Sequence, residues 1–119
     1  MTKLLYKKLK TQNMAYRNYN NYWVYILTNK RNGTLYIGVT GGIDDRMERH
    51  IAEEGSIFTS RYKLKMLIYY EEFQYINDAI AREKQLKNWH RQWKINLIED
   101  SNPNWNNLWK QLDSETSSE

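Results

Sequence analysis

The chain has 119 residues and a net charge of +4, with 40% hydrophobic residues, 27% charged residues and no cysteine. This length supports one domain, and the lack of cysteine excludes a disulfide scaffold, a thiolate zinc site and a cysteine nucleophile. No apolar stretch is long enough to span a bilayer, and the basic N-terminus lacks the apolar core of a signal peptide, so we expect a cytoplasmic protein without a membrane partner.

Residues 1–21 are basic, because they hold five lysines and arginines and no acidic residue. They mix lysine with Asn, Tyr and Gln without a sustained hydrophobic period, which predicts a mobile N-terminal extension. Two roles stay open for it: a poorly ordered leader, or an arm that attracts phosphate. Since this segment supplies most of the positive charge, the net charge is only weak support for a nucleic-acid partner.

A β-hairpin is predicted for the stretch WVYILTNKRNGTLYIGVT, in which two runs of β-branched and aromatic residues flank Asn32-Gly33. Its strands are expected at residues 22–28 and 34–39. Each strand carries one tyrosine, Tyr25 and Tyr36. Either both rings pack in a half-buried sheet, as most strand tyrosines do, or both hydroxyls project into one shared site. The strand register decides, because a shift of one residue turns a side chain to the other face.

A helix is expected after the breaker Gly41-Gly42, with Gly55 as its candidate C-cap. Acidic residues fall in its first turn, where negative charge is favourable. Its apolar residues form one stripe at helical spacing: Ile43, Met47 and Ile51. Arg46 and His50 are four residues apart and therefore share a face beside that stripe. An arginine and a histidine beside two strand tyrosines indicate a polar site.

Residues 55–65, GSIFTSRYKLK, are predicted to form a loop. Basic residues alternate there with Tyr and Leu, which suits contact with a phosphate backbone: Arg61, Lys63 and Lys65. A polar loop that enters a strand explains the same pattern. The third strand is expected at residues 66–70, apolar enough to be the central strand and ended by Glu71-Glu72.

A helical period runs through residues 76–99, with a break near residues 88–90 that divides the segment into two helices. Its apolar stripe consists of Ile76, Ala79, Ile80, Leu86, Trp93 and Leu97. Glu83 falls within this stripe, and a carboxylate that faces a core must be paired, hydrogen-bonded or bound to a cation. A buried ion pair with Arg46 is the structural alternative to a site role.

The turn Ser101-Asn102-Pro103 is expected to end the second helix. Aromatic and aliphatic residues after it are predicted to fold back onto the core: Trp105, Leu108 and Trp109. The acidic tail, residues 110–119, is predicted to be disordered. The domain proper is therefore expected to span residues 22–109.

The candidate site residues suit phosphodiester hydrolysis. A single carboxylate can bind Mg²⁺ when waters and phosphate oxygens complete the octahedron. The reaction needs an activated water, a cation and positive charge near the phosphorus, and tyrosine, metal and arginine can supply these in turn. The same set is unsuited to redox or acyl-transfer chemistry.

An ordered series of motifs resembles the GIY-YIG nuclease family, in particular its small single-domain bacterial members. The series is VYI at residues 24–26, YIG at residues 36–38, then Arg46 with His50, and then Glu83. The stretches FTSRYKL, AREKQLKNW and NPNWNNL extend the likeness over most of the chain. The resemblance implies an α/β (α+β) fold, in which a small central three-stranded sheet begins with a β-hairpin and is flanked by helices.

The resemblance also implies roles for the candidate residues. Tyr25 would act as or near the general base, and Tyr36 would orient the water or the scissile phosphate. Arg46 would stabilise the transition-state charge with help from His50, while Glu83 would bind one divalent ion, Mg²⁺ or Mn²⁺. DNA contacts are expected at Arg61, Lys63, Lys65, Lys84 and Lys87. An asparagine late in the domain often assists in the family, and both Asn96 and Asn102 are candidates here.

Some features of the chain limit this transfer. Val24 replaces the first glycine of the name-giving motif, and Val39 follows YIG where some members have a lysine. Homing endonucleases and the repair excinuclease C subunit attach the module to separate target-recognising domains, and we expect no such domain in this chain. We therefore predict a metal-dependent DNA endonuclease, with DNA repair as the expected setting, whose specificity comes from the module, the basic arm or a protein partner. The alternatives are a non-catalytic or partner-dependent nucleic-acid-binding module and a protein-interaction adaptor.

Overall fold

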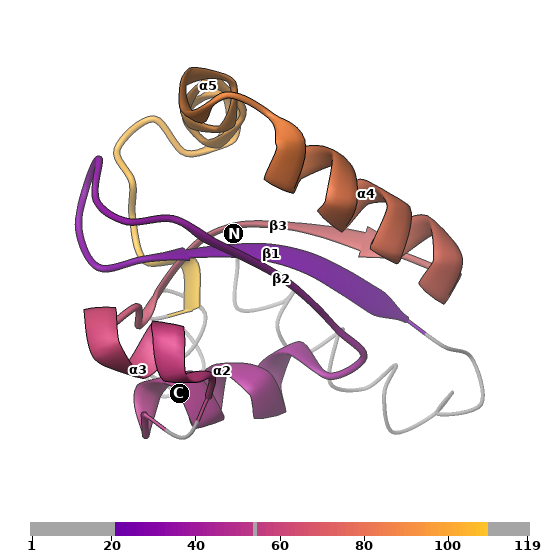
Figure 1. Ribbon diagram of the computed structural model, residues 1–119, viewed down its shortest axis with the longest axis horizontal. Coiled ribbons are helices and arrows are strands. Elements are labelled where there is room, and N and C mark those ends of the chain that lie inside the picture. The colour runs from indigo at the N-terminus through magenta and orange to yellow at the C-terminus, as the bar shows by residue number, and fades with distance from the viewer. Residues whose placement is uncertain (1–20, 54, 110–119) are drawn as a thin grey trace, which may run out of the picture.

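The computed structural model describes residues 21–53 and 55–109, so the predicted disordered tail and almost all of the basic extension lie outside the described residues. Figure 1 shows a central sheet with helices α2 and α3 on one face and helices α4 and α5 on the other. This is the α+β architecture that the sequence predicted. In chain order the elements are β1 (Tyr22–Thr28), β2 (Tyr36–Thr40), α2 (Ile43–Ile51), α3 (Ile57–Tyr62), β3 (Met66–Phe73), α4 (Ile76–Asn88) and α5 (Arg91–Ser101).

The sheet has the order β2-β1-β3, with both pairings antiparallel. Strand β1 is central because it is apolar on both faces, and every residue from Trp23 to Thr28 is buried. The prediction that residues 66–70 form the central strand is therefore wrong, since β3 lies at an edge. Glu71-Glu72 do not end this strand either; it continues to Phe73, because a carboxylate on an edge strand can reach solvent or a partner on a covering helix.

Two hydrophobic cores lie on opposite faces of β1. The core under α2 and α3 contains the odd-numbered residues of β1 together with Met47, Leu64 and Trp109. The core under α4 and α5 contains the even-numbered residues with Leu86, Ile98 and Trp105. This division follows from the pleat of the strand, in which successive side chains point to opposite faces. The prediction that Trp105 and Trp109 fold back onto the core is confirmed, with exposures of 2% and 6%.

The turn of the predicted hairpin is closed by side chains as well as by the backbone. Asn32 has a φ of 58°, a left-handed conformation that asparagine tolerates better than most residues. The Gly33 amide donates to the Lys30 carbonyl at 2.8 Å, and Arg91 of α5 donates to the carbonyls of Asn32 and Gly33 at 2.7 Å each. The second strand starts at Tyr36, two residues later than predicted.

Helix α2 begins as predicted, after Gly42, but it ends earlier than expected. Its C-cap is Ala52, so the prediction of Gly55 as the C-cap is wrong. Ile51, expected in the apolar stripe, is 42% exposed because it lies in the last turn, beyond the edge of the core.

The predicted loop at residues 55–65 contains a helix instead, α3. Ser56 is its N-cap, and the Ser56 hydroxyl accepts a hydrogen bond from the Thr59 amide at 3.1 Å. Lys63 ends the helix in a left-handed conformation with a φ of 59°. With 6 residues, α3 is too short to show a hydrophobic period, which explains why the sequence pattern suggested a loop.

The break predicted near residues 88–90 is confirmed, because α4 ends at Asn88 and α5 begins at Arg91. Two members of the predicted apolar stripe are exposed, Ile76 at 39% and Trp93 at 53%, because each lies in the first turn of its helix. Ile80 and Leu97 are partly buried, and Ala79 and Leu86 are fully buried. Among the described residues, no helix is both long enough and apolar enough to cross a membrane.

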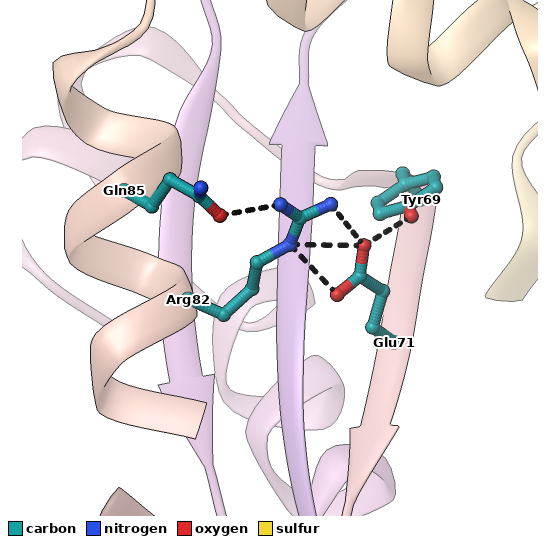
Figure 2. Close-up of polar contacts among 4 residues, drawn as sticks. All are labelled: Tyr69, Glu71, Arg82 and Gln85. Atoms are coloured by element: carbon teal, nitrogen blue, oxygen red, sulfur yellow. Dashed lines mark hydrogen bonds and ion pairs between the residues drawn. The ribbon is translucent and has the colours of Figure 1, made fainter. Parts of the chain in front are cut away.

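An ion pair attaches α4 to strand β3. The Arg82 guanidinium contacts both carboxylate oxygens of Glu71. Its Nε atom is 3.0 Å from Oε1, and its Nη2 atom is 2.9 Å from Oε2. Tyr69 also donates to Glu71, and Gln85 accepts from Arg82 (Figure 2). Burial alone would raise the pKa of Glu71, but the hydrogen bonds from Arg82 and Tyr69 outweigh it and lower that pKa. This network fixes the rotation of the helix that carries Glu83.

Candidate active site at the edge of the sheet

The register of the hairpin places both tyrosines on the same face of the sheet. Tyr25 of β1 pairs with Gly38, and Leu27 pairs with Tyr36, so Tyr25 and Tyr36 both point toward α2. Their ring centroids are 6.3 Å apart. Tyr25 is fully buried, whereas Tyr36 is partly exposed. The two rings therefore lie near each other on one face of the sheet.

Gly38 makes room for the Tyr25 ring. A Cβ atom at Gly38 would lie 2.5 Å from both Cζ and the hydroxyl oxygen of Tyr25. The tyrosine side chain therefore crosses over the backbone of β2 toward the outer edge of the sheet. The glycine of the YIG motif is required here by this close approach, not by backbone conformation, because none of the described glycines has a positive φ.

His50 contacts Tyr25 from helix α2. Its Nε2 atom is 3.2 Å from the Tyr25 hydroxyl, and its Nδ1 atom is 3.3 Å from the Thr59 hydroxyl. The Thr59 hydroxyl already donates to the Ser56 carbonyl at 3.0 Å, so it can only accept from His50. Nδ1 must then carry the proton, which leaves Nε2 as the acceptor for the Tyr25 O–H.

Electrostatics keep His50 and Tyr25 neutral at pH 7. Burial lowers the pKa of His50, and the nearby Arg46 guanidinium lowers it further. Burial likewise raises the pKa of Tyr25 well above its usual range, as does the neighbouring Tyr36. The charge of Arg46 and its hydrogen bond to Tyr25 act in the opposite direction without overcoming burial. Arg46 is thus the cationic group beside the phenol, as the spacing on α2 predicted.

Glu83 approaches this cluster from the other layer. It belongs to α4, on the opposite face of the sheet from α2 (Figure 1), and its side chain is 17% exposed. Its negative charge contributes to the raised pKa of Tyr25.

The partner of Glu83 differs from the predicted structural alternative. Within the described residues Glu83 forms its ion pair with Lys87, at 3.2 Å and four residues along α4, and not with Arg46. Lys87 is 53% exposed and can turn into solvent. Glu83 is therefore a half-buried carboxylate whose only described counter-charge is a surface lysine.

One carboxylate fits a metal ion that takes its other ligands from water and substrate. In residues 21–53 and 55–109, no three His, Cys, Asp or Glu side chains are grouped closely enough to hold an ion alone. Mg²⁺ is often held by one or two carboxylates while it keeps several waters. The oxygen ligand at Glu83 suits such an ion, and no thiolate is available in the chain.

The predicted DNA contacts fall into two groups on opposite sides of the sheet. Lys63 and Lys65, at the end of α3, both pair with Glu53, at 3.5 and 2.8 Å. Arg61 on α3 is exposed and makes no ion pair within the described part of the chain. The other group, Lys84 and Lys87, lies on α4 with Glu83, and both of its lysines are exposed.

Neither asparagine candidate contacts the tyrosine cluster. Asn102 is buried at 4% exposure and closes the turn after α5, donating to the carbonyls of Ile68 and Asn106 at 3.0 and 2.9 Å. Asn96 is exposed, accepts from Gln92 at 2.9 Å and lines a shallow hollow of about 400 Å³ with Trp93. The structure thus gives Asn102 a structural role.

Three supporting residues were missed by the sequence reasoning. The Thr59 hydroxyl contacts the ring of His50, Ser56 holds Thr59, and a Cβ atom at Gly55 would lie 2.5 Å from Nδ1 of His50. The available signal was the order Gly-Ser-x-x-Thr, a glycine followed by an N-cap serine and a hydroxyl three residues later. Nothing local connects that signal to a histidine on the preceding helix.

Comparison with known proteins shows which family the chain is similar to. A family model described as the GIY-YIG catalytic domain matches residues 21–96, which include both tyrosines, Arg46, His50 and Glu83. A UPF0213 protein of Staphylococcus haemolyticus is 34% identical over 79 residues, covering 66% of this chain and 95% of the relative. A UPF0213 protein of Pediococcus pentosaceus is 34% identical over 89 residues, covering 75% of this chain and 93% of the relative. The solution NMR structure of a UPF0213 protein from Bacillus halodurans is 28% identical with a TM-score of 0.49, covering 76% of this chain and 95% of that one.

Proposed function

The chain belongs to the GIY-YIG family, and from that premise we propose that it is a cytoplasmic endonuclease that hydrolyses phosphodiester bonds in DNA with one divalent metal ion. The observation that carries the proposal is the cluster of Tyr25, Tyr36, Arg46 and His50 at the open edge of the sheet, with Glu83 close enough to alter the pKa of Tyr25. Such a cluster, with perturbed pKa values, is typical of a functional site.

Proton transfer in this site would run from Tyr25 to His50. Tyr25 is not a phenolate at neutral pH, because its pKa is raised, so it cannot take a proton from water by itself. Its hydroxyl can accept a proton from the attacking water while its own proton passes to Nε2 of His50, 3.2 Å away. Thr59 keeps Nε2 free for that proton by binding the Nδ1–H.

The other residues have complementary roles. Tyr36 is the more exposed of the two tyrosines and would bind the attacking water or a phosphate oxygen. Arg46 would stabilise the extra negative charge of the pentacoordinate transition state. Glu83 would hold Mg²⁺ or Mn²⁺ once Lys87 turns away, and such an ion polarises the phosphate and lowers the pKa of its bound water.

The proposal is tested by cleavage assays with Mg²⁺ and Mn²⁺ on single-stranded, duplex, nicked and branched DNA. The wild type should cut at least one substrate, and Glu83→Gln should lower that rate by about 100-fold or more, the size expected for a group that stabilises the transition state. Glu48→Gln, an exposed glutamate on α2, is the matched control and should keep full activity. A wild type that cuts no substrate, or a fully active Glu83→Gln variant, would contradict the proposal.

A second candidate is a nucleic-acid-binding module without turnover, alone or dependent on a protein partner. The observation in its favour is the ion pair with Lys87, which neutralises the carboxylate that a metal ion would need. Under this alternative, salt-dependent DNA binding would persist without cleavage in every metal condition.

A further inference from the structure

Helix α3 carries an exposed pair of aromatic side chains. Phe58 and Tyr62 are four residues apart and therefore share a face of the helix, with their ring centroids 4.8 Å apart. They are 42% and 43% exposed, and the neighbouring Ile57 is 88% exposed. A short helix that leaves three large apolar side chains in solvent, while it buries only Thr59, is unusual for a purely structural element.

This aromatic pair continues a row of rings that starts in the candidate active site. Phe58 stacks on Tyr36 with the centroids 6.2 Å apart and an angle of 28° between the planes. Tyr36 in turn lies 6.0 Å from the His50 ring and 6.3 Å from the Tyr25 ring. The row thus leads outward from the buried Tyr25 to the exposed Tyr62.

We propose that Phe58 and Tyr62 form a platform on which unpaired bases of a DNA strand stack beside the phosphate held at Tyr36, so that the preferred substrate contains a single-stranded segment. This inference rests on the proposed function, which places the scissile phosphate at the tyrosine cluster. Bases in a duplex are stacked on each other and cannot lie on a protein ring, whereas every unpaired base has a free face that an aromatic side chain can cover.

The charge around the platform matches a phosphodiester backbone. Arg61 lies on α3 between the two rings in sequence and is exposed. Lys63 and Lys65 follow directly, and together they face one carboxylate, Glu53, so the end of α3 keeps an excess of positive charge. Aromatic rings interleaved with cations are the usual surface for single-stranded nucleic acid, and a surface for an apolar protein partner would not need these cations.

The test is binding measured by fluorescence anisotropy, with EDTA present so that no DNA is cut. The probes are a labelled single DNA strand of about 12 nucleotides, within the range of known single-strand site sizes, the blunt duplex of the same sequence, and the RNA strand of that sequence. The variants are Phe58→Ala/Tyr62→Ala, Phe58→Leu, which keeps apolar bulk without the ring, and Tyr62→Phe, which keeps the ring. Tyr75→Ala is the matched control, because Tyr75 is 62% exposed and lies beyond the opposite end of β3 from α3.

We expect the double alanine variant to bind the single strand about tenfold or more weakly, the loss expected when base stacking is removed. Phe58→Leu should lose most of that affinity, whereas Tyr62→Phe and Tyr75→Ala should bind like the wild type. Blunt-duplex binding should change less than twofold in all variants. Circular dichroism on each variant shows whether the fold is kept.

Three results would overturn the platform. The first is unchanged single-strand binding by the folded double variant, the second is an equal loss on blunt duplex, and the third is full affinity of Phe58→Leu. RNA that binds as tightly as DNA, with the same dependence on Phe58, would overturn the assignment to DNA. Failure of the platform and failure of the proposed function can be told apart, because binding needs no turnover. If the wild type binds the strand through Phe58 but never cuts it, only the proposed function is refuted. If the wild type cuts DNA while the double variant binds normally, only the platform is refuted.

Discussion

The Tyr25 side chain is positioned by residues of two elements, helix α2 and strand β2. Nε2 of His50 in α2 accepts from the Tyr25 hydroxyl at 3.2 Å, the charge of Arg46 in the same helix acts to lower the pKa of that hydroxyl, and Gly38 of β2 leaves the space in which the ring lies. Buried polar groups need such partners, because an unsatisfied buried hydroxyl costs free energy. The phenol is therefore oriented before any substrate binds.

Gly38→Ala tests the close approach of the Tyr25 ring to β2. The new methyl group would meet Cζ and the hydroxyl oxygen of Tyr25 at 2.5 Å, so the ring must move. We expect a loss of about 1–3 kcal/mol in unfolding free energy, as for other overpacked positions, together with a loss of nuclease activity. Gly41→Ala is the control, since its Cβ atom would be 3.6 Å from the nearest atom, on the Tyr22 ring. Equal stability and activity of the two variants in urea denaturation and cleavage assays would show that Tyr25 does not need the glycine.

The pKa of His50 predicts how stability depends on pH. Burial and Arg46 lower this pKa below the ordinary value of 6.5 in the folded state, so the unfolded chain binds the proton more readily. Stability should therefore fall as the pH drops from about 6.5 through the folded pKa, and it should not change through this residue above pH 6.5. Urea denaturation between pH 7.5 and about 5 measures the slope.

Two histidine variants separate this effect from other titrations. His50→Gln should remove part of the fall in stability, whereas His90→Gln, at an exposed position before α5, should keep all of it. If the slope disappears in His90→Gln and persists in His50→Gln, the pH dependence comes from His90, and the prediction for His50 is wrong.

At the scale of elements, the short helix α3 has more effect on the site than its length suggests. Its Thr59, held by the N-cap serine, contacts His50, and its exposed rings extend the row that begins at Tyr36. The sequence pattern of residues 55–65 indicated basic and aromatic contacts, and this part of the prediction awaits the binding test. The pattern missed the helix, because so short a helix is stabilised by its caps and by tertiary packing instead of an amphipathic period.

Arg82→Ala tests how α4 is held against β3. Arg82 and Glu71 are 23% and 21% exposed, so loss of the arginine leaves a half-buried carboxylate with fewer partners (Figure 2). We expect a loss of about 1–3 kcal/mol in unfolding free energy, the usual cost of such an unsatisfied group. The control is Arg49→Ala, whose pair with Asp45 is 60% and 76% exposed and should contribute less than about 0.5 kcal/mol. Similar losses for the two variants in chemical denaturation would mean that the Arg82 pair is no more than a surface contact.

The whole molecule is organised around one strand that is buried on both sides. Because β1 supplies alternate residues to both cores, neither core can form without it. Trp105 and Trp109, at the end of the described chain, then close one core each. The two layers should therefore fold as one cooperative unit.

Met47→Ala and Ile98→Ala test this cooperativity from the two sides of the sheet. Each residue is fully buried, one in each core, and each substitution should cost about 2–5 kcal/mol. Tryptophan fluorescence and far-ultraviolet circular dichroism should give one shared unfolding midpoint for each variant, with an unchanged m value. Separate midpoints for the two probes, or a clearly smaller m value, would show that the layers unfold independently.

Local pattern was sufficient to predict most elements of this protein and to single out candidate site residues. Alternating and helical periods, breakers and turn residues are properties of neighbouring residues, so they identified β1, the hairpin, the start of α2 and the break between α4 and α5. Motif order identified Tyr25, Tyr36, Arg46, His50 and Glu83. Only the tertiary structure decided that β1 is central, that both tyrosines face α2, that Glu83 pairs with Lys87, and that Thr59 sets the tautomer of His50. These features depend on strand register and on contacts between residues far apart in the chain, and a pattern within one segment does not contain that information.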